Sequence, residues 1–175
     1  TVDNTPPSGT VSVPAWSTSA QAPMTISSPD AVAVQFSNGW IWEGEDLRHQ
    51  DGTGARVADP EALNGAAWKG TAGSSVRGYW YGPYALNLPP WRTYQVYFRL
   101  KSPRTWGTVP LALIDVSDNQ GTRVYQSRAI TGQDVPSGGY HEYVLDVAYQ
   151  STEPIFHGVE NGLEFRTWYE SIADL

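Results

Sequence analysis

Two carboxylates stand two positions apart at Glu43 and Glu45, inside the run Ile41–Leu47, which has the pattern of an extended strand. Side chains two apart on a strand share one face, about 7 Å from each other. Like charges at that distance repel unless a cation lies between them, and a hard divalent ion such as Ca²⁺ suits both carboxylates. The alternative is a pair of solvated carboxylates on an exposed strand. Because both lie on one strand, they cannot flank a glycosidic bond from two sides.

Aromatic side chains are the second feature that could carry a function, because the 175 residues include eight Trp, ten Tyr and four Phe. A core of this size takes up only part of these rings. A ring held on a Gly- or Pro-rich loop can stack on the apolar face of a pyranose, while neighbouring polar groups fix its orientation. The alternative is that each ring plugs an open end of the fold. The stacking candidates are Trp80, Tyr81, Trp68, Trp106, Tyr84 and Trp91, with Asn64 and Arg104 as polar companions.

The elements that must position these residues are short β-strands separated by turns. Apolar and polar residues alternate in several runs, which is typical of half-buried strands. Strands are expected at 41–47, 94–101, 111–116, 123–130, 143–149 and 163–169, with weaker ones at 11–13 and 31–36. The turn residues at 117–121 predict a hairpin between two of them, and one short helix is expected near Pro60–Leu63. The sequence therefore predicts an all-β, antiparallel, jelly-roll-like sandwich.

The chain divides by composition into two parts. Residues 1–38 are rich in Pro, Ser and Thr, which indicates an extended N-terminal β segment. This segment is either a linker or a strand docked on its own sandwich or on a neighbouring one. Residues 39–175 carry the strand pattern and form the expected sandwich domain.

Charge and residue usage exclude several function classes. The net charge is −7 with scattered basic residues, so a nucleic-acid partner is not expected. No apolar run approaches the ~20 residues that span a bilayer, so membrane insertion is not expected either. Cysteine is absent, and neither a His-x-His pair nor a Gly-x-Ser-x-Gly elbow occurs, so we expect no enzyme. Two lysines beside many Ser, Thr, Tyr and Trp residues are typical of secreted or cell-surface polysaccharide-associated domains.

The run Trp42-Glu43-Gly44-Glu45-Asp46-Leu47 resembles the first strand of the calcium-binding jelly-roll carbohydrate-binding modules of families six and thirty-five. Their opening pattern is aromatic-Glu-Ala-Glu, followed by a Gly-rich stretch, and the general resemblance extends over about residues 40–175. It implies a structural Ca²⁺ and a polysaccharide or glycan partner. The family also implies a late Asp that completes the calcium site. Either Asp174 fills that role, or another segment supplies the ligand, or the site is incomplete.

Two functions follow as hypotheses. The first is an extracellular, non-catalytic carbohydrate-binding domain stabilised by calcium. The second is a structural subunit of an extracellular filament or surface layer, in which the N-terminal segment donates a β-strand to another copy of the chain. The second rests on two observations: the Pro/Ser-rich N-terminal segment, and the last strand that the resemblance to the modules lacks, because the segment of one copy could fill the open edge of the next. Separately, Asp3-Asn4-Thr5-Pro6-Pro7 and Phe36-Ser37-Asn38-Gly39 resemble pieces of bacterial immunoglobulin-like surface repeats.

Overall fold

The computed structural model describes residues 10–12, 25–27, 39–85, 88–136, 139–150 and 162–175. The chain separates into two compact units, Thr1–Trp40 and Ile41–Leu175. In the first unit, β1 (Thr10–Ser12) pairs antiparallel with β2 (Thr25–Ser27). The strand expected at 31–36 lies outside the described residues.

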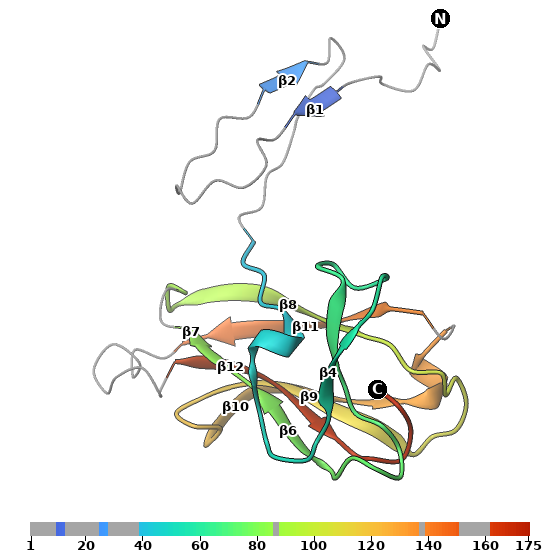
Figure 1. Ribbon diagram of the computed structural model, residues 1–175. Helices are drawn as coiled ribbons and strands as arrows, with labels where there is room; N and C mark the ends of the chain where they lie inside the picture. Colours follow the sequence, from blue (N-terminus) through green and yellow to red (C-terminus); the bar gives the residue numbers. More distant parts are fainter. Residues whose placement is uncertain (1–9, 13–24, 28–38, 86–87, 137–138, 151–161) are drawn as a thin grey trace, which may run out of the picture. The chain divides into compact units, whose positions relative to one another are not determined.

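The second unit is an antiparallel β-sandwich, as the strand pattern predicts, and its two main sheets form two layers (Figure 1). The large sheet has the order β10-β9-β12-β6-β3, with β7 also paired to β12. Its strands are β3 (Arg48–His49), β6 (Gly78–Tyr81), β7 (Pro83–Ala85), β9 (Pro110–Asp118), β10 (Arg123–Thr131) and β12 (Leu163–Tyr169). The small sheet pairs β8 (Arg92–Leu100) with β11 (His141–Tyr149) over their full lengths. A separate hairpin joins β4 (Ala55–Ala58) to β5 (Ala66–Lys69).

The core lies between the large and small sheets and follows the period of two in their sequences. On β11, every second side chain from Tyr143 to Tyr149 is buried, and the intervening ones are exposed. The facing layer contributes Ile114 and Val116 of β9, both fully buried. The main cluster is Ala85, Leu88, Phe98, Ile114, Val116, Ile130, Tyr143, Leu145, Val147, Tyr149, Leu163 and Phe165.

Five of the six stronger strands expected are confirmed, β1 covers most of the weaker strand expected at 11–13, and the hairpin around 117–121 joins β9 to β10. Two expectations are wrong. Residues Pro60–Leu63 form turns rather than a helix: the backbone N–H of Ala62 donates to the carbonyl of Asp59, and that of Gly65 donates to the carbonyl of Ala62, as two separate turn bonds. The run Ile41–Leu47 is not a strand, since Gly44–Asp46 forms the short 3₁₀ helix η1. A second one, η2, covers Gly132–Asp134.

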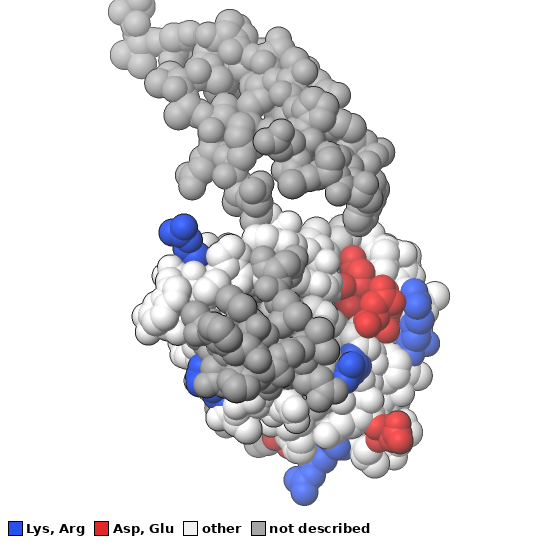
Figure 2. All heavy atoms as spheres, turned by 90° about the vertical axis from the view of Figure 1, so that its left-hand side faces the viewer, with Lys and Arg blue, Asp and Glu red and all other residues white. Residues whose placement is uncertain are grey.

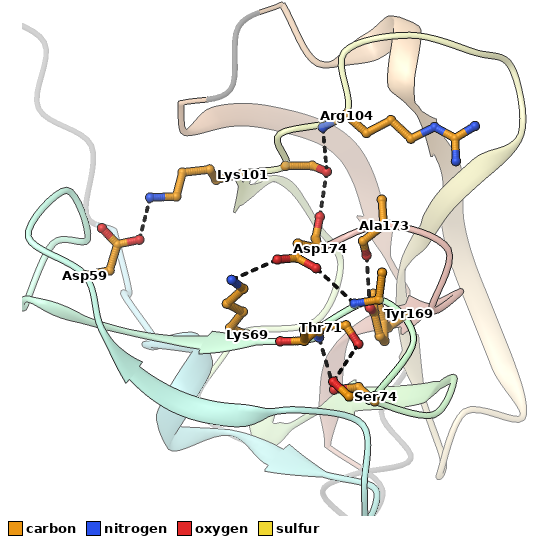
Figure 3. A network of polar contacts seen from close by, with 12 residues as sticks. Asp59, Lys69, Thr71, Ser74, Lys101, Arg104, Tyr169, Ala173 and Asp174 are labelled. Carbon is orange, nitrogen blue, oxygen red and sulfur yellow. Dashed lines mark hydrogen bonds and ion pairs between the residues drawn. The ribbon is translucent and has the colours of Figure 1, made fainter.

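Residues Ala173–Leu175 are tied to the sandwich by a polar network (Figure 3). Leu175 and Gly70 exchange two backbone hydrogen bonds of 3.1 Å, and the Leu175 side chain joins a second buried cluster. The Asp174 carboxylate lies 2.9 Å from the Lys69 ammonium. The hydroxyl of the buried Ser102 donates to the Asp174 carbonyl at 2.6 Å. These contacts join the end of the described chain to β5 and to the segment after β8.

Candidate functional site

The outer face of the large sheet carries the candidate site, because charged side chains on its central strands point away from the core. On β12, Leu163 and Phe165 belong to the core, so Glu164 and Arg166 project to the opposite side. On β9, the same alternation turns Asp115 outward, directly opposite Arg166 in the register. The sheet pairing therefore gathers three charged groups at the middle of one face.

Asp115 and Arg166 form a buried two-pronged ion pair. The guanidinium donates from Nε to Oδ1 at 2.7 Å and from Nη2 to Oδ2 at 3.0 Å. Their side chains are 3% and 11% exposed. Burial raises the pKa of the Asp115 carboxyl, while the guanidinium opposes that rise. Because both carboxylate oxygens are engaged, Asp115 fixes Arg166 in place and is itself closed to a ligand.

Glu164 is a buried acidic side chain of this group that lines a hollow on the outer face. The residue is 3% exposed, and its Oε1 has no hydrogen-bond partner among the residues that the structure describes. Burial raises the pKa of this carboxyl, and Asp115 raises it further, against the lowering effects of Arg166, a Gly121 N–H bond and Arg48. A buried carboxylate oxygen without a donor is costly, so this oxygen requires a donor from an ordered water or a bound ligand.

The hairpin turn between β9 and β10 closes one side of this group. Gly121 adopts a left-handed backbone with φ 77°, and a Cβ there would lie 1.7 Å from Nη1 of Arg166. Only glycine lets the turn approach the guanidinium so closely. The turn therefore holds the side chains of β12 against the sheet.

Tyrosine rings wall the remaining sides. Tyr79 and Tyr81 flank the core-facing Trp80 on β6 and so lie on the outer face. Arg166 stacks over the Tyr79 ring at 4.9 Å, and the Tyr81 ring meets Tyr84 edge-on at 6.4 Å. Together these groups line a shallow, open hollow of about 180 Å³. It is lined by Gln50, Tyr79, Tyr81, Tyr84, Gln120, Glu164 and Arg166.

The six predicted stacking aromatics are dispersed. Tyr81 and Tyr84 line the hollow, although they lie on strands and not on loops. Trp80 is only 7% exposed and packs against Tyr169 in the core, so the structure contradicts its proposed stacking role. Trp91 and Trp106 lie outside the strands and are 65% and 67% exposed.

The other three predicted ligand residues have protein partners. Trp68 is half-buried on β5 and stacks on His49, with ring centroids 3.5 Å apart. Asn64 donates to Glu45 at 2.6 Å and accepts from the backbone N–H of Ala66. Arg104 stacks over the Trp106 ring at 4.4 Å. None of the three lines the hollow beside Glu164.

Glu43, Glu45 and Asp174 do not gather into one metal-binding group in the described part of the chain. Glu45 is buried in η1, where it accepts from Asn64, and Asp174 is engaged by Lys69. Burial raises the pKa of Glu43, and the neighbouring carboxylates of Glu45 and Asp46 raise it further. Across the described ranges, no three His, Cys, Asp or Glu side chains gather as a metal-binding group. Calcium binding stays a prediction from the sequence.

Sequence reasoning missed Glu164, Arg166, Tyr79, Gln50 and Gln120. A signal was present on one strand: Glu164 and Arg166 alternate with the apolar Leu163 and Phe165, which places charges on one face. The partners of those charges come from β9 and β6 and depend on the strand order, which the alternation does not reveal.

Comparisons with known proteins add no family. No protein-family model matches the chain, and no match was found among curated proteins or solved structures. No helix within the described ranges is both long and apolar enough to cross a membrane.

Proposed function

We propose that the outer face of the large sheet binds an uncharged carbohydrate without cleaving it, in an extracellular setting. The observation that carries this proposal is Glu164, a buried carboxylate whose Oε1 has no donor in the described part of the chain and which lines a tyrosine-walled hollow. Sugar hydroxyls are the donors that such an acceptor needs, and aromatic walls suit the C–H faces of a pyranose.

The charges around the hollow support an uncharged ligand. Glu164 and Asp115 are acidic, and Arg166 and the nearby Arg48 are basic, so two charges of each sign balance. Arg48 lies over the Tyr84 ring at 4.8 Å. Figure 2 shows one face of the molecule, on which basic side chains lie apart from one another and acidic side chains gather toward one side. A sulfated or uronic-acid polymer would meet Glu164 with like charge.

Binding without cleavage is supported by the state of the second carboxylate. Glycoside hydrolysis needs two carboxyl groups that both act on the bond. Asp115 is the other buried acid of this face, and Arg166 already occupies both of its oxygens.

The volume of about 180 Å³ lies below the ~300–1,000 Å³ of typical ligand clefts, so the hollow suits a single sugar ring.

Affinity electrophoresis tests this proposal. We expect retardation of the 175-residue chain in gels that contain one of the uncharged polymers β-glucan, xylan, mannan or galactan. Polygalacturonate and chitosan serve as acidic and basic comparisons. Tyr81→Ala is expected to weaken the retention about tenfold, because it removes a wall of the hollow. The matched control is Tyr97→Ala, which truncates a 54% exposed tyrosine on the small sheet. The proposal fails if no uncharged polymer retards the protein, or if Tyr81→Ala and Tyr97→Ala migrate alike.

Filament assembly by strand donation is the second candidate function, and the small sheet favours it. Within the described residues, β8 and β11 pair only with each other, so the outer edge of each strand carries unpaired backbone groups. A strand from another copy would satisfy such an edge.

Light scattering of the full chain and of a chain without residues 1–38 separates this candidate from a monomeric binding domain. Strand donation predicts concentration-dependent assembly of the full chain and a monodisperse truncated one. A full chain that stays monomeric across the concentration range would exclude it.

A further inference from the structure

A second hollow lies on the outer face of the small sheet. It has a volume of about 160 Å³ and is lined by Trp91, Arg92, Thr93, Ala148 and Gln150. Thr93 and Ala148 are cross-strand neighbours whose side chains are exposed, while the adjacent Tyr149 points into the core. The alternation on β8 and β11 therefore places this hollow on the side of the small sheet that faces away from the sandwich interior.

The backbone at Trp91 presents its ring to this hollow. Trp91 has a left-handed conformation with φ 62°, which is an outlier for a bulky residue. Its N–H donates to the Tyr149 carbonyl at 2.7 Å, which anchors the residue to the end of β11. The side chain is nevertheless 65% exposed. Strain of this kind persists where the surroundings enforce it and is concentrated at functional sites.

The two hollows lie on opposite outer faces of the sandwich. Glu164 and Tyr81 belong to the outer face of the large sheet, and Thr93 and Ala148 to that of the small sheet. The buried cluster fills the space between the sheets. A single short oligosaccharide cannot reach both hollows, so each would hold its own chain.

We propose that the hollow at Trp91 is a second carbohydrate site, which makes the unit Ile41–Leu175 bivalent and able to cross-link two polysaccharide chains. This inference rests on the proposed function of the large sheet. The exposed indole face is the stacking surface for a pyranose, and the Arg92 guanidinium and the Gln150 amide are donors for its hydroxyl and ring oxygens. A bivalent module gains avidity on a polymer without any new contact at either site.

The test uses the uncharged polymer that retards the wild-type chain, in solution, and its hexasaccharide. Light scattering follows the growth of cross-linked polymer, and titration calorimetry counts the hexasaccharides bound per chain. For the wild type we expect polymer cross-linking and two bound hexasaccharides. Trp91→Ala is expected to keep one bound hexasaccharide, to lose cross-linking and to bind the polymer at least tenfold more weakly.

Two further variants serve as controls. One tests whether the effect of Trp91→Ala comes from misfolding, and the other tests whether the loss of any exposed tryptophan has the same effect. Trp91→Gly relieves the left-handed backbone, so its melting temperature should equal or exceed that of the wild type while cross-linking is lost. Trp106→Ala removes an equally exposed tryptophan, 67% against 65%, that lines neither hollow, and should behave as the wild type.

The outcomes distinguish the two proposals. If wild type and Trp91→Ala both bind one hexasaccharide, or if both cross-link the polymer equally, the second site is overturned and the large-sheet site stands. If no uncharged polymer binds the wild type, the proposed function fails, and the second site falls with it.

Discussion

Replacing Asp115 with alanine is expected to lower the free energy of unfolding by about 3–5 kcal/mol, because it leaves the Arg166 guanidinium buried without its partner. Both oxygens of Asp115 accept from Arg166, and the two side chains are 3% and 11% exposed. Both side chains are too little exposed for bulk water to replace those bonds in full. Urea unfolding at neutral pH measures the change.

A matched variant at an exposed acidic residue shows how much of the stability loss comes from the burial of the ion pair and how much from removing a carboxylate. Glu61 pairs with Lys101 at 3.2 Å, but its side chain is 64% exposed, so Glu61→Ala should cost less than about 1 kcal/mol. The double variant Asp115→Leu with Arg166→Leu should regain most of the lost stability, because removing both charges avoids an unpaired one. An Asp115→Ala protein as stable as Glu61→Ala would contradict the buried pair.

The strands were predictable because their signal is local. On β11, the alternation of buried Tyr143 and Leu145 with exposed neighbours is written in consecutive residues, and the structure keeps it. The strand predicted around Glu45 does not form, and the cause is a long-range contact. Its carboxylate accepts from Asn64, nineteen positions away, and this contact accompanies a 3₁₀ turn in a run whose sequence favours a strand.

The candidate site could be predicted only in part for the same reason. The sequence singles out Tyr81 and Tyr84 as unusual rings, and both line the hollow. It does not show that β12 lies between β9 and β6, and this order is what brings Glu164 and Arg166 beside Tyr79. The prediction for Trp80 is wrong because a ring between glycines is equally compatible with the core, where its Nε1 donates to the buried Thr53.

Replacing Glu164 with glutamine is expected to change stability and binding in opposite directions. The amide keeps the shape of the side chain but removes a buried charge whose Oε1 has no donor in the described residues, so the free energy of unfolding should rise by about 1–2 kcal/mol. Carbohydrate affinity should fall about 10- to 100-fold, since a hydrogen bond to a charged acceptor contributes ~1.5–3 kcal/mol. Calorimetric titration and thermal melting of the same preparations measure both effects.

The pH dependence of stability is an independent test of the destabilisation that we expect from the charged Glu164. Burial raises the pKa of Glu164, so on acidification the folded protein takes up this proton before the unfolded chain does. The loss of folding stability caused by the charged Glu164 is therefore full above the raised pKa. It disappears as the pH falls toward the ordinary glutamate pKa near 4.3. The stability advantage of Glu164→Gln over the wild type should shrink over that interval, and wild-type carbohydrate binding should weaken as the carboxylate is neutralised. A Gln variant that is less stable than the wild type at neutral pH and binds equally well would mean that Glu164 has a protein partner and no ligand.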